Sequence, residues 1–180
     1  MRILYLNAYL DRFDFWTGQR GRELVDALRN AGLEVQTLPC IPPTPDQEAA
    51  PVSASSSGFK RYIKTKLPKK WLILLVELYL IARGIARTVR LPIQVWRRRR
   101  DARPDLVLAR SFEYEWGPWI VAKFLKRPLV LEVHAPFFVE RQFRGREDSR
   151  FFRWYEGVLW RRAARVWVHT RELERIVADN

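Results

Sequence analysis

Polar side chains gather at the end of a short apolar run, Leu129–Val133. The run follows Pro128 and is rich in β-branched residues, which is typical of a buried strand. Glu132 lies inside it, and His134 and Pro136 follow where the strand leaves the core. An imidazole at a strand tip can hydrogen-bond a sugar hydroxyl or a developing charge. His134 is therefore the first candidate for chemistry, and a structural histidine satisfied by neighbouring backbone is the alternative.

A second polar group follows another predicted strand, Asp105–Arg110. Arg110, Glu113 and Glu115 occur there, and Glu140 belongs to the same predicted rim. Guanidinium and carboxylate groups bind polyols through charge-assisted hydrogen bonds. Paired carboxylates also suit glycoside hydrolysis, although the sequence does not fix their separation. Ordinary solvated loop charge is the remaining interpretation.

Few other motifs suggest chemistry. Gly18 lies where the first strand turns into the first helix, so backbone amides there can hold a phosphate, but it can equally be a simple turn glycine. His169 lies at another strand end without comparable neighbours, which favours a structural role. With one cysteine and two distant histidines, the sequence predicts no metal site. It contains no G-x-G-x-x-G, Walker or G-x-S-x-G motif.

The elements that must position these residues form an α/β pattern. A strand (2–7), a glycine-bearing loop, a helix (about 19–30, with Gly32 as its stop) and a strand (33–38) make a βαβ unit. Further strands are predicted at 105–110, 129–133 and 164–169, and helices at 116–125, 151–162 and after the N-cap Thr170. Ligands of such parallel sheets bind beyond the carboxyl ends of the strands, where the polar groups should meet.

Composition indicates one globular domain. The chain has 180 residues, of which 48% are hydrophobic. The single cysteine, Cys40, excludes an internal disulfide framework and suits a reducing compartment. The opening residues do not resemble a signal peptide, and the longest apolar run, Trp71–Ala82, contains Glu77 and is too short for a membrane span.

The charge of +13 is concentrated in one region. Between Lys60 and Arg103 there are 14 basic residues against two acidic ones. This region (59–103) is helical by pattern, with breaks near Pro68 and Pro92, and follows a Pro- and Ser-rich loop at 40–58. Its ends carry Lys69, Lys70, Arg97, Arg98, Arg99 and Arg100, which fit a membrane surface. A core-packing helix with a solvated basic rim is the main alternative; nucleic-acid binding lacks any familiar module.

The order of the segments RILYLN, the TG loop, AGLEVQTL, PDLVLARSFEYE, RPLVLEVHAPFFVER and ARVWVHTREL resembles the amino-terminal domain of family 4 glycosyltransferases. That resemblance implies the GT-B fold of two facing Rossmann-like domains, of which this α/β domain binds the acceptor. It implies sugar transfer from a nucleotide-sugar with retention of configuration, with no cofactor and usually no metal. Whether the nucleotide is UDP or GDP stays open.

By the same resemblance, His134 is the catalytic histidine that faces the reacting sugar. Gly18, with Thr17, matches the turn that approaches the donor diphosphate, and Arg110, Glu113 and Glu140 fall in loops that face the acceptor. The basic segment matches the surface through which many members dock on membranes.

The second, donor-binding domain is absent from these 180 residues. We therefore expect the chain alone to lack transferase activity, and to need a further domain or a partner chain. The expected acceptor is a lipid-linked or polysaccharide glycan at the cytoplasmic face of a membrane. The alternative is a non-catalytic α/β module that binds membranes or polyanions.

Overall fold

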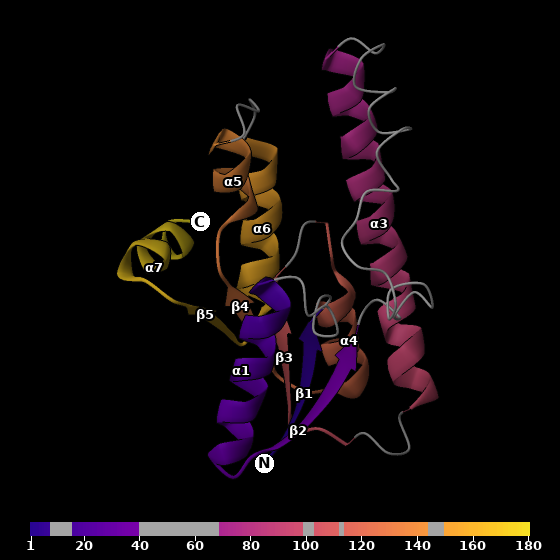
Figure 1. Ribbon diagram of the computed structural model, residues 1–180, viewed down its shortest axis with the longest axis vertical. Coiled ribbons are helices and arrows are strands. Elements are labelled where there is room, and N and C mark those ends of the chain that lie inside the picture. Colours follow the sequence, from indigo (N-terminus) through magenta and orange to yellow (C-terminus); the bar gives the residue numbers. More distant parts are fainter. Residues whose placement is uncertain (8–15, 40–68, 99–102, 112–113, 144–149) are drawn as a thin grey trace, which may run out of the picture.

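A five-stranded parallel sheet forms the centre of the computed structural model, which describes residues 1–7, 16–39, 69–98, 103–111, 114–143 and 150–180. Its strands are β1 (Arg2–Asn7), β2 (Glu34–Pro39), β3 (Leu106–Arg110), β4 (Leu129–Val133) and β5 (Arg165–Val168), in the order β2-β1-β3-β4-β5 (Figure 1). All four pairings are parallel, so the carboxyl ends of the strands share one edge. The predicted Rossmann-like α/β fold is confirmed.

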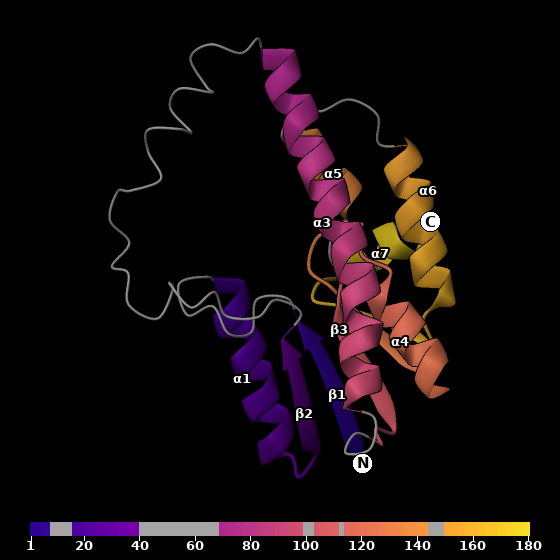
Figure 2. The same ribbon diagram turned by 90° about the vertical axis from the view of Figure 1, so that its right-hand side faces the viewer.

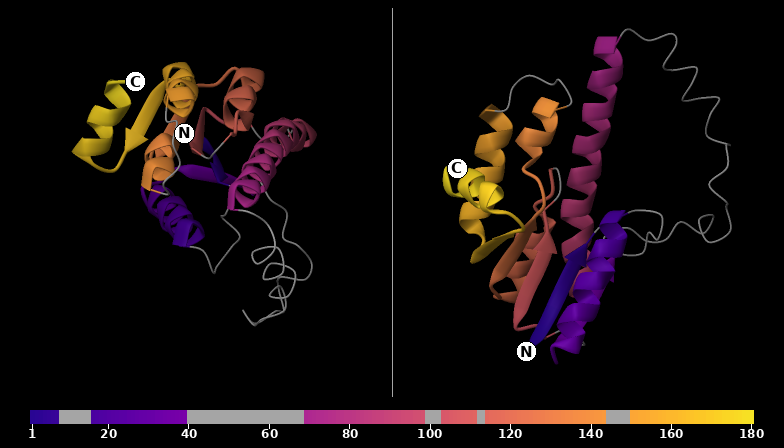
Figure 3. Two further views of the ribbon diagram at one scale, coloured as in Figure 1. Left: turned by 90° about the horizontal axis from the view of Figure 1, so that it is seen from above. Right: turned by 60° about the vertical axis from the view of Figure 1, so that its left-hand side comes forward.

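Helices cover both faces of the sheet. They are α1 (Trp16–Asn30), α3 (Lys69–Arg97), α4 (Gly117–Leu125), α5 (Phe137–Phe143), α6 (Arg150–Arg162) and α7 (Arg171–Ala178). Helix α1 lies on one face, whereas α3, α4 and α6 lie on the other (Figures 2 and 3). None of the described helices is both long and apolar enough to cross a membrane.

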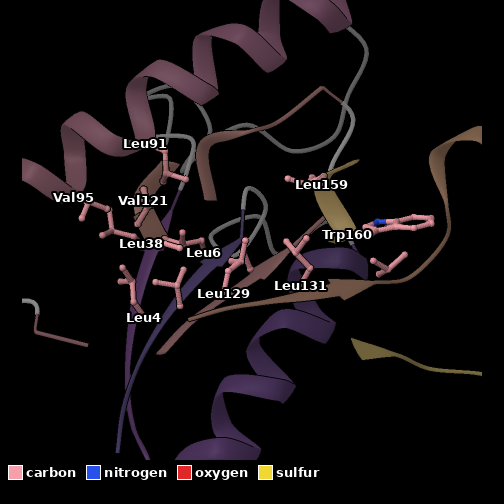
Figure 4. Packing of buried hydrophobic residues seen from close by; sticks show 14 of the residues in the cluster. Leu4, Leu6, Leu38, Leu91, Val95, Val121, Leu129, Leu131, Leu159 and Trp160 are labelled. Carbon is pink, nitrogen blue, oxygen red and sulfur yellow. The ribbon is translucent and has the colours of Figure 1, made fainter. Parts of the chain in front are cut away.

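Two apolar cores hold these layers together. The larger one packs strand residues against α3, α4 and α6, and includes Leu6, Leu91, Val121, Leu131 and Trp160 (Figure 4). The smaller one, built around Ile3, Tyr5, Val25, Val35 and Leu108, lies beneath α1. Alternate residues of β1, β2, β3 and β4 serve the two cores, which explains why these strands read as largely apolar runs.

The long helix α3 differs from its predicted form. We expected a break near Pro92, but α3 runs unbroken from Lys69 to Arg97 with that proline inside it. A proline in a helix interior costs about 3 kcal/mol. Leu91 and Val95 flank it and are 1% and 0% exposed. Each such burial contributes about 1.5–3 kcal/mol, so packing offsets the cost and the prediction of a break was wrong. The predicted break at Pro68 and the 40–58 loop lie outside the described residues.

Helix α3 contacts the segment before α4 very closely. A Cβ atom placed on Gly84 would lie 2.5 Å from Cβ of Tyr114, so only glycine fits there. About two turns earlier, Glu77 accepts hydrogen bonds from the Tyr114 hydroxyl (2.9 Å) and from Nη1 of Arg141 (2.6 Å). The Arg141 guanidinium lies 4.0 Å from the ring centre of Phe152. These contacts tie α3 to α5 and α6.

Helix α5 was not predicted. Its first two amides, those of Phe137 and Phe138, donate to the carboxylate of Glu156 at 2.8 and 3.0 Å. Glu156 belongs to α6, is 5% exposed, and so caps a helix that precedes it by 13 residues or more. A carboxylate at this position also complements the helix dipole.

Local end signals mostly agree with the prediction. Thr170 caps α7 by accepting from the amide of Leu173 at 3.2 Å, and Gly32 follows α1 with φ of +80°. Helix α1 begins at Trp16 rather than Gln19, which places the backbone of Thr17 and Gly18 inside its first turn.

Candidate functional site

The candidate site lies at the carboxyl edge of the sheet, on the face that α1 partly covers. Strand alternation directs Tyr5 and Asn7 of β1 to this face, together with Arg110 of β3 and Glu132 of β4. The pairing register places Arg110 beside Glu132 and Val133 beside Val168. The residues that follow the last pair, His134 and His169, are thereby brought side by side.

Glu132, His134 and His169 form what we call the histidine–glutamate cluster. Oε1 of Glu132 lies 2.6 Å from Nε2 of His134 and 3.3 Å from Nε2 of His169. The two Nε2 atoms are 3.2 Å apart, while the ring centres are 4.2 Å apart. The rings therefore converge on the carboxylate through their Nε2 atoms.

The carboxylate of Glu132 is buried and held on its other oxygen. Its Oε2 accepts a hydrogen bond from the Tyr5 hydroxyl (3.3 Å), which itself accepts one from Nδ2 of Asn7 (3.1 Å). Burial raises the pKa of Glu132, but the hydrogen bonds from His134 and His169 and the charges of His134 and Arg110 outweigh it, so the pKa lies below its ordinary value. Glu132 is therefore a fixed, ionised carboxylate at neutral pH.

Arg110 supplies positive charge beside the cluster. It is 4% exposed, and burial holds its pKa below the ordinary value, although the nearby Glu132 and Tyr5 raise that pKa. The positive charge of Arg20, near the start of α1, is close enough to lower the pKa of Arg110 further. The amino end of α1 therefore lies near the same strand ends.

The cluster can orient an imidazole toward a bound hydroxyl group. Glu132 fixes the His134 ring from below, as a carboxylate does in histidine-based sites. The side chains of His134 and His169 remain 22% and 40% exposed, so both are accessible from solvent. A buried cation, a buried anion and two accessible imidazoles suit a polyhydroxylated ligand.

The other predicted site residues take different positions. Thr17 and Gly18 lie in the first turn of α1, where helix amides have no partner within the helix. Glu140 is half-buried in α5, on the segment that follows His134. Glu113 lies outside the described residues. The roles of these residues, and of Arg110 and His134, stay predictions.

Glu115 lies away from this site. It is 2% exposed and lies next to α3, where Nη1 of Arg87 is 3.8 Å from Oε2 of Glu115. Burial raises the pKa of Glu115 to about 7, although Arg87 and Arg83 lower it. The structure thus gives Glu115 and Arg87 a place in the helix packing, and the face shared by Arg83 and Arg87 is not a solvated basic surface.

The opposite side of α3 is apolar and exposed. We call this the outward face of α3, made up of Trp71, Leu74, Leu75, Leu78, Tyr79, Ile85, Val89, Ile93 and Trp96, each at least 44% exposed. Lys69 and Lys70 lie at one end of the helix, and Arg97 and Arg98 at the other, about 40 Å away. Arg99 and Arg100 lie outside the described residues. The upper part of α3 extends beyond the strand ends (Figures 1 and 2).

Sequence reasoning missed two members of the site, Tyr5 and His169, whereas Glu132 was expected in the polar rim around His134. Tyr5 was treated as a strand residue. His169 was expected to lie without polar neighbours, which was wrong because β5 pairs directly with β4. The signal was present in the register: His134 and His169 each follow the last residue of their strand. Only the strand order could reveal that these ends are neighbours.

Comparison with known protein families identifies a family to which the chain is related. Residues 17–180 match the family described as glycosyl transferase 4-like domain. Comparisons with curated proteins and with solved structures give no match. The match covers most of the chain, including α1, all strands after β1, and the histidine–glutamate cluster. The chain therefore belongs to the glycosyl transferase 4-like domain family.

Proposed function

We propose that this chain is the acceptor-side domain of a retaining glycosyltransferase that uses a nucleotide-sugar. The observation that carries the proposal is the convergence of His134, Glu132 and Arg110 at the carboxyl ends of the strands, in a member of a glycosyltransferase family. In this proposal His134 hydrogen-bonds the reacting sugar and Glu132 holds its ring.

The remaining roles in this proposal follow the resemblance to the family. The first-turn amides of α1, at Thr17 and Gly18, approach the donor diphosphate, since helix amino ends favour anions. Arg110, Glu113 and Glu140 contact the acceptor. Departure of a phosphate from an anomeric carbon needs electrostatic stabilisation, which a second, donor-binding domain or partner chain provides.

We further propose that the enzyme works at the cytoplasmic face of a membrane on a lipid-linked or polysaccharide acceptor. The support is the outward face of α3, an apolar stripe with basic residues at both ends. Such a stripe suits the boundary between lipid headgroups and acyl chains. Each arginine or lysine near an anionic leaflet adds about 1 kcal/mol of attraction.

Sugar transfer tests the main proposal. The chain is expressed alone and together with the coding sequence that follows it, and each product is incubated with labelled UDP- and GDP-sugars and a membrane lipid extract. We expect transfer only from the longer product, and loss of transfer in its His134→Ala variant. Transfer by the 180-residue chain alone would disprove its dependence on a second domain.

The alternative is a non-catalytic α/β module that binds membranes or polyanions, and the outward face of α3 is the observation in its favour. It predicts vesicle binding without sugar transfer in either form of the protein. Vesicle binding together with His134-dependent transfer rejects it.

A further inference from the structure

We propose that the histidine–glutamate cluster is a binding site for a divalent transition-metal ion, with Zn²⁺ as its best match. Two imidazole nitrogens and one carboxylate oxygen make up the His₂Glu donor set used by accessible zinc sites, in which a further position stays open. The proposal concerns binding, and it goes beyond the transferase function proposed above.

The distances fit tetrahedral coordination. A tetrahedron with metal–ligand bonds of about 2.0 Å has edges of about 3.3 Å. Two edges of the cluster already have this length, at 3.3 Å from Glu132 to His169 and 3.2 Å between the histidines. The third, at 2.6 Å from Glu132 to His134, is a hydrogen bond that must open by about 0.7 Å when the metal replaces the shared proton.

The surroundings fix the ligands. The Tyr5 hydroxyl holds the second oxygen of Glu132, and Asn7 holds Tyr5. Outer contacts of this kind orient ligands, and their loss typically weakens metal binding by about 10–100-fold. Since both histidine side chains are partly exposed, an ion can enter from solvent. Imidazole ligands favour zinc and similar metals over Mg²⁺ and Ca²⁺, which prefer oxygen.

One neighbour opposes binding. The positive charge of Arg110 already interacts favourably with the carboxylate of Glu132, so a metal ion would have to compete with this arginine for the carboxylate. We therefore expect weaker binding than at closed structural zinc sites, where four ligands surround the metal.

The proposed metal shares His134 with the proposed sugar site. Nε2 is the nitrogen that meets Glu132, so a metal bound there leaves only Nδ1 of His134 for a hydrogen bond to the sugar. Metal binding is measured on the chain without donor or acceptor, so that its outcome is independent of any transferase assay.

The test is a Zn²⁺ titration of the untagged chain in competition with a fluorescent chelator, in a Cys40→Ser background so that the thiol contributes no ligand. We expect one equivalent of Zn²⁺ to bind, and the affinity to fall at least about tenfold in His169→Ala. His169 is exposed, so this substitution should leave the fold intact, as circular dichroism checks. Glu172→Gln, an exposed carboxylate on α7, is the matched control and should bind like the parent.

Cobalt provides a second measurement that needs no variant. Co²⁺ bound by the parent chain should give the intense visible absorption of a tetrahedral site, and Zn²⁺ should abolish it. Failure of the parent to bind Zn²⁺, equal affinity of the parent and His169→Ala, or a purely octahedral Co²⁺ spectrum would each overturn the proposal.

Discussion

The Nε2 atoms of His134 and His169 lie 3.2 Å apart, although 35 residues separate them along the chain. Helices α5 and α6 lie in that interval, after which β5 pairs in parallel with β4. Both histidines follow the last residue of their strands, so the pairing alone brings them together over Glu132. The site is thus a product of sheet topology.

If the proposed function holds, replacing His134 by alanine in the longer, active protein should reduce turnover by at least about 100-fold, because the proposed hydrogen bond to the reacting sugar is lost. The fold should persist, since His134 is only partly buried. Sugar transfer and thermal unfolding measured on the same sample separate the two effects. Glu172→Gln serves as the control of unchanged activity, and a full rate in His134→Ala removes the residue from the site.

Glu115 should make stability fall as the pH rises. Its pKa in the folded protein is about 7, whereas an exposed glutamate has a pKa near about 4.3. Between these two pH values Glu115 is ionised in the unfolded chain but still protonated in the folded protein, so ionisation favours unfolding. Once the pH exceeds the folded pKa, the loss of stability is on the order of 3 kcal/mol. Urea unfolding should therefore give a lower free energy of unfolding at pH 7.5 than at pH 4.5. The Glu115→Gln variant should lack this decrease.

The control for that measurement is Asp26→Asn, which removes an exposed carboxylate on α1. The free energy of unfolding of this variant should fall between pH 4.5 and 7.5 as much as that of the parent. An identical pH dependence of the parent and Glu115→Gln would show that Glu115 is already ionised in the folded state.

Gly84→Ala should destabilise the protein by about 1–3 kcal/mol, because the new methyl group would overlap Cβ and the carbonyl oxygen of Tyr114. In an unconstrained helix the same change stabilises by about 0.5–1 kcal/mol, so the sign is diagnostic. Urea titration gives the free energy of unfolding. Ala86→Ser, at an exposed position of the same helix, should change it by less than about 0.5 kcal/mol.

Glu156→Gln should weaken the amino end of α5 by about 1–2 kcal/mol, since charged acceptors make the stronger hydrogen bonds to helix amides. Hydrogen exchange at the amides of Phe137 and Phe138 should accelerate more than exchange in β1. Uniform acceleration throughout the protein would indicate a general loss of stability in place of a local one.

Leu78→Ser combined with Ile85→Ser should reduce binding to anionic vesicles by at least about tenfold, because both residues lie on the outward face of α3 and are more than half exposed. Flotation with liposomes measures the bound fraction. Phe124→Ser, on α4, removes a similarly exposed apolar group and should leave binding unchanged. Equal losses in both variants would indicate nonspecific adhesion.

Neutralising Arg97 and Arg98 together should weaken vesicle binding by about 2 kcal/mol, or roughly 30-fold, at low salt. Both side chains are exposed at the end of α3. The loss should shrink at high ionic strength, because salt screens the attraction. Insensitivity to both the substitutions and salt would leave the apolar face as the sole contact.

The strands were predictable because each is a short apolar run between turn signals, and β1 and β4 were placed without error. Helix α5 was not, because its cap comes from Glu156 on a later helix and leaves no local signal. The expected break at Pro92 failed for a related reason: burial of Leu91 and Val95 outweighs a local preference.

The sequence identified some residues of the candidate site by their type and position, but it did not show which residues would be neighbours in the fold. His134 stood out as an imidazole at a strand tip, and Arg110 as a cation at another. His169 and Tyr5 gained their roles only through contacts with Glu132, which depend on strand order and register. Those contacts join residues up to 127 positions apart, beyond the reach of any local pattern.

Glu77 gives the domain a mechanical property. By binding both Tyr114 and Arg141, it braces the protruding half of α3 against α5, the helix that directly follows His134. These two hydrogen bonds couple the orientation of α3 to that of α5. If α3 binds a bilayer, its depth and orientation in the lipid would therefore also fix the distance and orientation of the two imidazoles relative to the membrane surface, although the lipid does not touch them.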